Sequence, residues 1–179
     1  HKWGMSEKWR KKMKLAKVIA ALTLMALSTV QVQAGALQEI LSSGILKVGT
    51  TGDWNPMTMK DAATNSYTGY DIDVMTELAA DLGVELELVP TEWKTLVAGV
   101  TAGKYHMTGS ASVSPARAKA TGYSISYFSL ATVPLTLKSN AEKYKDWDDL
   151  NQAGVRVAAT LGTTQEKQVK QYFLSLIHI

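Results

Sequence analysis

The feature that most constrains the fold is an alternation of strand-like and helix-like patterns between residues 45 and 109. Short apolar or period-two runs are typical of β-strands, whereas apolar side chains three or four residues apart indicate amphipathic helices. The predicted strands cover residues 45–49, 84–89 and 105–109, and the predicted helices cover residues 71–83 and 91–103. Strands that are joined through helices form a parallel sheet, so we predict an α/β fold.

The ends of these elements carry signals of their own. Asp71 can cap the start of the first helix, and Gly83 can end it. Ser114 followed by Pro115 is typical of a helix start, and the pair predicts a short helix that runs to about residue 120. A turn-rich stretch at residues 61–69 predicts a hairpin.

A second group of elements is predicted after residue 120. An apolar run at residues 130–137 is expected to form a strand, and Pro134 favours a sheet edge or a crossing segment for it. The composition becomes polar and charged near Ser139, where we place the boundary between two lobes. Beyond that boundary we expect a helix that starts at residues 144–147, a strand at 155–158 and a helix at 165–173.

The first 34 residues have the order of a secretory signal peptide. Six basic residues between positions 8 and 17 precede a mostly apolar stretch at positions 18–30, and small side chains then allow cleavage after Ala34. A membrane anchor is the alternative, but the apolar stretch is shorter than the roughly 20 residues that cross a bilayer core. The segment therefore predicts export to a periplasm.

The formal net charge of +3 comes from this same segment. Residues 1–34 hold seven of the 19 Lys and Arg residues and one of the 16 acidic residues, so the rest of the chain carries a net charge of −3. Nucleic-acid binding is not expected, because it requires a basic patch on the folded part. The chain has no cysteine and three scattered histidines, so we expect neither a metal site nor a cofactor.

Residues 174–179, Leu-Ser-Leu-Ile-His-Ile, resemble the translation of a common sequencing adapter. We expect this hexapeptide to be an artefact, and a short apolar strand is the alternative. The predicted organisation is a signal peptide at residues 1–34, a first α/β lobe at 35–138, the start of an incomplete second α/β lobe at 139–173 and the artefact at 174–179.

Three loops carry polar side chains from which a ligand site could be built. Each loop follows a predicted parallel strand, and ligands bind at the carboxyl ends of such strands, near helix N-termini. The loops cover residues 50–54, 109–117 and 161–165. An ordinary turn, a capped helix with a solvated arginine and a simple helix N-cap are the respective structural alternatives.

Each loop offers a different chemistry. In the first, Asp53 places a carboxylate beside the aromatic face of Trp54. In the second, alternate serines precede Arg117, whose guanidinium can bind a carboxylate through two parallel hydrogen bonds. In the third, a glycine and two threonines at a helix N-terminus can form a cradle for an anion.

Four stretches, taken together, resemble the family-3 extracellular solute-binding proteins of amino-acid ABC transporters. They are ILKVGTTGDWNPM, GYDIDVMTELAADLG, SASVSPARAKATGYSISY and GVRVAATLGTTQEK. The resemblance implies a periplasmic-binding-protein type II fold, in which two α/β lobes enclose a ligand cleft, with the second lobe truncated here. It also implies a monomeric periplasmic protein that delivers a small-molecule ligand, a free amino acid, to an ABC permease in the inner membrane.

The same resemblance implies roles for individual residues. Arg117 would clamp the α-carboxylate with help from Ser112 and Thr164, and Ser110 would lie near the amino group. Trp54 and Trp93 would form apolar walls, while His106 stands where the family has Asp and is interpreted as a structural substitute. The predicted ligand-binding residues are Asp53, Trp54, Trp93, Ser110, Ser112, Arg117, Thr163 and Thr164, with no catalytic residue.

A second resemblance keeps an enzymatic function open. The stretches GTTGDW, PTEW and NQAGV look like the periplasmic cyclohexadienyl dehydratases, carbon–oxygen lyases that convert prephenate or arogenate by loss of water and carbon dioxide. The loop LGTTQ departs from the Gly-Gly-Thr-Asn type of loop that those enzymes have. A binding protein and a dehydratase are therefore both hypotheses from the sequence, with the binding protein favoured.

Overall fold

The computed structural model describes residues 35–173 and 176–178. Its contacts divide the chain into residues 1–35 and residues 36–179, and the elements of the second unit begin with α2 (Ala36–Ser43). The predicted signal peptide lies outside the described residues, as do residues 174, 175 and 179 of the predicted artefact. Within the described ranges, no helix combines the length and the apolar character that a membrane span requires.

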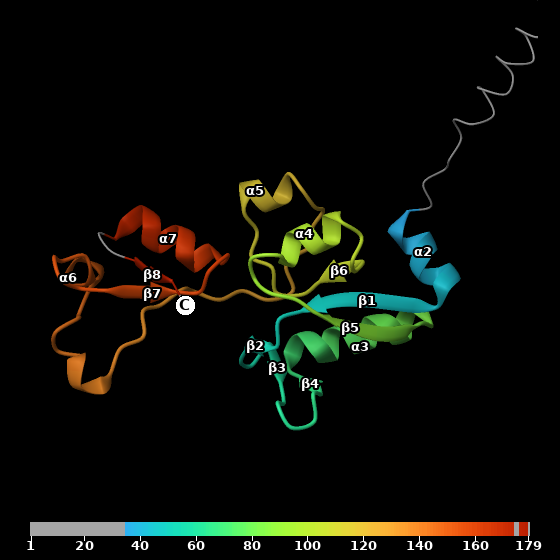
Figure 1. Ribbon diagram of the computed structural model, residues 1–179, viewed down its shortest axis with the longest axis horizontal. Helices are drawn as coiled ribbons and strands as arrows, with labels where there is room; N and C mark the ends of the chain where they lie inside the picture. The colour runs from blue at the N-terminus through green and yellow to red at the C-terminus, as the bar shows by residue number, and fades with distance from the viewer. Residues whose placement is uncertain (1–34, 174–175, 179) are drawn as a thin grey trace, which may run out of the picture. The chain divides into compact units, whose positions relative to one another are not determined.

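The second unit contains a three-stranded parallel sheet, called the central sheet (Figure 1). Strand β1 (Ile45–Thr50) lies in the middle, with β5 (Glu85–Pro90) on one side and β6 (Met107–Thr108) on the other. The β1–β5 pairing is parallel along six residues and starts at Ile45 opposite Glu85. The predicted parallel α/β arrangement is thus confirmed, although β6 is shorter than the predicted strand.

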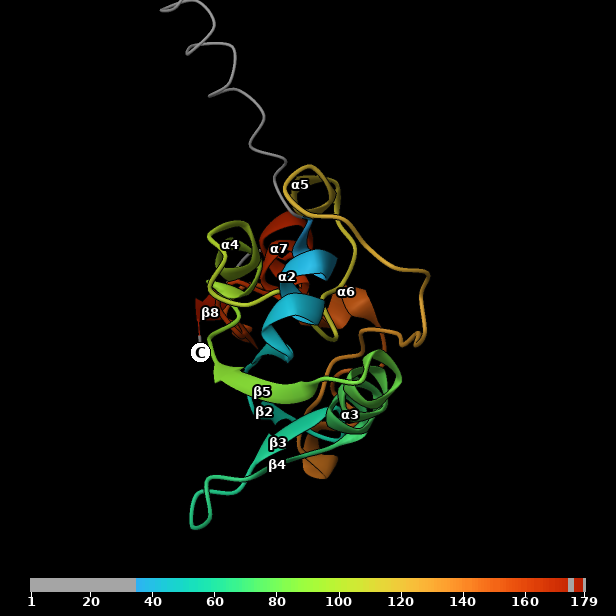
Figure 2. The ribbon, with the colours of Figure 1, turned by 90° about the vertical axis from the view of Figure 1, so that its right-hand side faces the viewer.

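The core lies between this sheet and two helices. Helix α3 (Tyr70–Leu82) packs against β1 and β5, as Figure 2 shows for α3 and β5, and α2 packs against β1. The buried cluster is made of Ile40, Leu46, Val48, Met75 and Ala79. Its members come from all three elements, because helical spacing in α3 and alternation in β1 direct apolar side chains to the same side.

The two ends of α3 test the predicted caps. Gly83 ends the helix in a left-handed conformation, with φ of 67°, as the sequence predicts. The prediction for Asp71 is wrong, because Gly69 precedes the helix and Asp71 lies in its first turn, with 4% of its surface exposed. The Asp71 carboxylate instead accepts a hydrogen bond from Tyr127, a partner 56 residues away.

Helix α4 (Leu96–Thr101) is shorter than predicted and starts after Thr95 rather than after Thr91. The buried ring of Tyr105 explains how this helix is fixed to the sheet. Its hydroxyl donates to the carbonyl of Leu96 at 2.7 Å, and a Cβ on Gly49 would lie 2.6 Å from its ring. Gly49 therefore permits β1 to approach the tyrosine that supports α4.

The predicted hairpin is present as an antiparallel sheet of three short strands. These are β2 (Asp53–Trp54), β3 (Thr58–Lys60) and β4 (Tyr67–Thr68), with β3 in the middle. Because β2 directly follows the loop after β1, the hairpin sheet places Asp53 and Trp54 beside the carboxyl end of the central sheet.

Residues 122–137 form neither helix nor strand, so the strand predicted at 130–137 is wrong. Val133 is 74% exposed and Leu135 is 99% exposed. A strand requires hydrogen bonds to a neighbouring strand, and no described strand pairs with this segment. Pro134 also lacks the N–H group that a sheet interior would use.

The remaining elements follow the predicted order. They are α5 (Pro115–Ala118), the 3₁₀ turn η1 (Lys138–Asn140), α6 (Trp147–Leu150), β7 (Val157–Ala159), α7 (Thr164–Tyr172) and β8 (Leu176–His178). Ser114 caps α5, with its hydroxyl accepting from the Arg117 N–H, and Pro115 occupies the first helical position. Strand β8 pairs in parallel with β7, starting with Val157 opposite Leu176.

Candidate ligand-binding site

The three predicted loops surround one cavity of about 170 Å³. It is lined by Asp53, Trp54, Trp93, Ser110, Ser112, Arg117, Thr160, Thr163, Thr164 and Gln165. All eight residues that the sequence singled out are in this set, and Thr160 and Gln165 were missed. The volume lies below the roughly 300–1,000 Å³ of pockets for drug-sized molecules, so the cavity suits a small ligand.

Arg117 provides the positive charge in the cavity wall. It is only 9% exposed, its Nη1 donates to the Ser112 carbonyl at 3.1 Å, and its Nη2 donates to the Gly162 carbonyl at 3.2 Å. The predicted help of Ser112 concerned the ligand carboxylate, and in the structure the arginine contacts the Ser112 main chain. A guanidinium has five N–H donors, so three of them have no acceptor among the described residues.

Two tryptophans form an aromatic corner of the cavity. The rings of Trp54 and Trp93 meet edge to face, with centroids 5.5 Å apart and planes at 71°. Trp93 Nε1 donates to Asp53 Oδ1 at 2.9 Å. Asp53 therefore holds the indole of Trp93 in place, a role that the sequence analysis did not include.

The two threonines of the third loop donate their hydroxyl hydrogens to different acceptors. Thr163 caps α7, because its Oγ1 accepts from the Glu166 N–H at 3.2 Å and donates to the Thr160 carbonyl at 2.7 Å. Its hydroxyl hydrogen is thus used inside the loop. Thr164 is in the first turn of α7, where its Oγ1 donates to Gln165 Oε1 at 3.2 Å.

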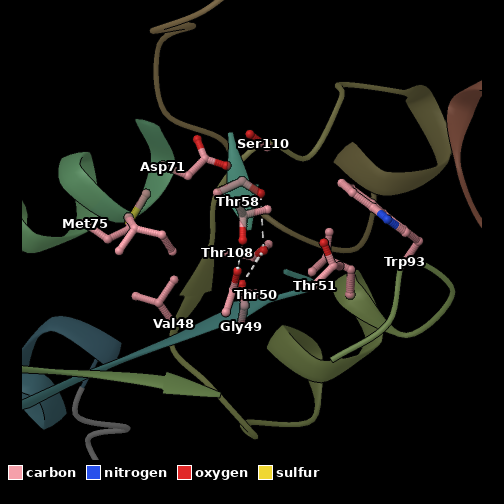
Figure 3. A pocket seen from close by; sticks show the side chains of 13 residues that line it. Val48, Gly49, Thr50, Thr51, Thr58, Asp71, Met75, Trp93, Thr108 and Ser110 are labelled. Carbon is pink, nitrogen blue, oxygen red and sulfur yellow. Dashed lines mark hydrogen bonds between the residues drawn. The ribbon is translucent and has the colours of Figure 1, made fainter. Parts of the chain in front are cut away.

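A second, smaller cavity shares Trp93 and Ser110 with the first, and Figure 3 shows the side chains that line it. Threonine hydroxyls line much of it, and Thr50 Oγ1 lies 2.6 Å from Thr58 Oγ1. The volume of about 10 Å³ is close to the minimum that holds one water molecule. This cavity is therefore too small for the ligand.

Asp71 borders the smaller cavity and carries a perturbed carboxyl group. Burial raises its pKa, more than the Ser110 and Tyr127 hydroxyls lower it. Burial also raises the pKa of Tyr127, because the phenolate would lose its hydration and would stand beside the Asp71 charge.

His106 is outside the cavity. Its Nδ1 accepts a hydrogen bond from the Lys47 N–H at 3.0 Å, and its Nε2 lies 3.7 Å from a carboxylate oxygen of Glu39. This geometry agrees with the interpretation of His106 as a structural residue. No cluster of three or more His, Asp and Glu side chains in the described part of the chain is arranged to hold a metal ion.

Residues 46–174 match the family model of the bacterial extracellular solute-binding proteins, family 3. The chain belongs to this family. Its fold is the type II periplasmic-binding-protein fold, which its structural relatives share. An ancestral amino acid-binding protein, described as a precursor of cyclohexadienyl dehydratase, has a TM-score of 0.75 and 37% identity over 80% of this chain and 64% of its own length.

Other relatives of this family-3 protein differ in what their names say they bind. A Streptococcus pneumoniae amino acid ABC transporter substrate-binding protein bound to L-arginine has a TM-score of 0.74 and 29% identity, over 81% of this chain and 62% of that one. The cyclohexadienyl dehydratase of Pseudomonas aeruginosa is 32% identical over 86% of this chain and 57% of its own length. The L-cystine-binding protein of Bacillus subtilis is 32% identical over 56% of this chain and 38% of its length. The chain thus spans little more than half of the dehydratase and less of the cystine-binding protein.

Proposed function

We propose that this chain is the binding component of an amino-acid ABC transporter and that it holds a free amino acid by its α-carboxylate. The observation that carries the proposal is the buried guanidinium of Arg117, with three N–H donors that have no acceptor among the described residues. Burying a charge without an opposite charge beside it is costly, and no described residue forms an ion pair with Arg117. A carboxylate can accept two parallel hydrogen bonds from a guanidinium.

The remaining walls suit the other parts of an amino acid. The α7 N-terminus presents Thr164 to the cavity, and main-chain N–H groups at the start of a helix attract a negative group. Ser110 is the residue that we assign to the amino group, and the edge-to-face pair of Trp54 and Trp93 offers apolar surface to the side chain. The family membership and the arginine-bound relative support this assignment.

The proposal includes export and a membrane partner. The basic and apolar segments of residues 1–34 would direct the chain to the periplasm, where the protein acts as a monomer and delivers its ligand to a permease in the inner membrane. N-terminal sequencing of the exported protein is expected to find Gly35 first. Recovery of residues 1–34 on the protein in a membrane fraction would contradict this part of the proposal.

A cyclohexadienyl dehydratase is the second candidate, since a relative of that name covers 86% of this chain. Such an enzyme needs a group that protonates the departing hydroxyl. Of the described residues that line the cavity, Asp53 is the one with a carboxyl group, and it accepts the indole N–H of Trp93. A carboxylate used in this way orients the indole of Trp93.

The deciding experiment uses the longest native reading frame that contains this sequence. Calorimetric titrations with L-arginine, L-histidine and L-cystine are run beside an absorbance assay for the conversion of prephenate to an aromatic product. We expect saturable binding of one of these amino acids and no prephenate turnover. Turnover without amino-acid binding would establish the dehydratase instead, and the absence of both would overturn both candidates.

A further inference from the structure

Three segments that are far apart in the sequence contact one another at the main chain of Ser110. They are the first turn of α3, the loop after β6 and residues 122–137. Tyr127 Oη donates to Asp71 Oδ1 at 2.9 Å, and the same oxygen accepts a hydrogen bond from the Ser110 N–H at 3.0 Å. The carboxylate fixes the direction of the Tyr127 O–H bond, so a lone pair of the hydroxyl oxygen is directed at the main chain of the loop.

The loop has an unusual conformation at this contact. Ser110 has φ of 53°, in the left-handed region that residues other than glycine rarely occupy. The preceding glycine makes the close approach possible, because a Cβ on Gly109 would lie 2.9 Å from Asp71 Oδ2 and 3.2 Å from Tyr127 Oη. Such a conformation persists where its surroundings determine it, and it often occurs at ligand sites.

Tyr127 is 40% exposed and has an aromatic neighbour. Its ring stacks on Tyr70 with centroids 6.2 Å apart, and Tyr70 also contacts Phe128 at 5.7 Å. A second tyrosine from the same segment acts on the same loop, because Tyr123 Oη donates to the Ser112 carbonyl at 3.3 Å. Two phenol hydroxyls from residues 122–137 therefore hold the loop that supplies Ser110 and Ser112 to the cavity.

We propose that Asp71 and Tyr127 are positioning residues of the ligand site, in which Asp71 orients the Tyr127 hydroxyl and that hydroxyl holds Ser110 in its left-handed conformation. Neither side chain lines the ligand cavity, whereas Ser110 does. The pair sets ligand affinity through the main chain of Ser110. This inference rests on the proposed function for its effect on binding, but its structural part can be tested without a ligand.

The first test replaces Tyr127 by Phe, which removes the hydroxyl and keeps the ring on Tyr70. One neutral hydrogen bond contributes on the order of 1 kcal/mol, so the dissociation constant for whichever of L-arginine, L-histidine or L-cystine binds should rise roughly fivefold. Tyr70→Phe is the matched control, because it removes a hydroxyl from the same ring cluster, and the described residues give the Tyr70 hydroxyl no hydrogen-bond partner. Its affinity should equal that of the wild type.

The readout that separates positioning from general stability is the Ser110 amide. In Tyr127→Phe its ¹H–¹⁵N signal should move and its hydrogen exchange should speed up, while the melting temperature stays close to that of Tyr70→Phe. Asp71→Asn keeps an oxygen acceptor for the Tyr127 hydroxyl, whereas Asp71→Leu does not. Asp71→Asn should therefore recover ligand affinity that Asp71→Leu loses. An unchanged Ser110 signal in Tyr127→Phe would overturn the proposal.

A double-mutant cycle tests whether Tyr127 acts through Ser110. If it does, Tyr127→Phe should change affinity less in a Ser110→Ala background than in the wild type, because the hydroxyl that it positions is already gone. Additive effects of the two changes would contradict the inference. If the wild type binds none of the three amino acids, the proposed function fails, and the Ser110 amide still decides the positioning of the loop.

Discussion

Strand β5 and residues 130–137 both end or break at a proline and were both predicted to form strands, yet only β5 does so. All six residues of β5 are paired with β1, and its Leu86 and Leu88 pack against the buried core. Residues 130–137 have no pairing strand among the described elements, and Leu135 is almost fully exposed. Both segments have side chains that favour strands. They differ in whether a neighbouring strand is there to pair with them.

The comparison teaches that β-structure is decided outside the segment that forms it. A strand satisfies its N–H and C=O groups only on a neighbour, whereas a helix satisfies most of them internally. The helical pattern of α3 therefore located a real element within one residue at each end. The local pattern at residues 130–137 indicated an extended chain, but it could not show whether a neighbouring strand pairs with that chain.

The largest expected effect on stability comes from truncating a buried leucine to alanine in the paired sheet, compared with the same change in residues 130–137. Leu46 is fully buried in β1, so Leu46→Ala should lower the free energy of unfolding by about 3 kcal/mol, within the usual range for buried leucines. Leu135→Ala should change it by less than about 0.5 kcal/mol. Urea unfolding of both variants checks the contrast, and equal losses would show that residues 130–137 are packed.

Two glycines provide a smaller contrast of the same kind. Gly83 ends α3 at φ of 67° with open space around its Cβ position, so Gly83→Ala should cost about 1 kcal/mol through backbone strain alone. Gly122 has equally open surroundings and no positive φ, so Gly122→Ala should be neutral or slightly stabilising. Equal shifts in the melting temperatures of the two variants would contradict the backbone conformations assigned to Gly83 and Gly122.

The smallest effect concerns the pH dependence of two carboxyl groups. Burial raises the pKa of Asp71 above 3.8, so the folded state binds its proton more tightly and stability falls as pH rises from 3.8 through the folded value. The Thr64 N–H lowers the pKa of exposed Asp61, which therefore stabilises the fold above 3.8 and loses that effect as pH falls. Asp71→Asn and Asp61→Asn should change the slope of stability against pH in opposite directions, measured by urea unfolding from about pH 3 to pH 7. Slopes that change in the same direction would contradict these shifts.

The sequence was sufficient for the parallel sheet and for much of the site. The carboxyl ends of parallel strands meet at one edge, so loops recognised separately could be expected to share a cavity. Gln165 lies within the third loop and Thr160 directly precedes it, so the same rule could have included both among the candidate residues. The pairing of Asp71 with Tyr127 spans 56 residues and has no local pattern. That contact explains why a residue expected to cap a helix is instead buried against the site.

The central claim is that Arg117 binds the carboxylate of an amino acid, and one measurement tests it most directly. Charged hydrogen bonds contribute about 1.5–3 kcal/mol each, so Arg117→Ala should weaken binding about 100-fold, and Arg117→Lys should recover part of the loss. Arg156 is exposed, and Arg156→Ala is the matched control that should bind as the wild type does. Calorimetric titration with the amino acid that the wild type binds gives the answer. An unchanged dissociation constant in Arg117→Ala would contradict the account.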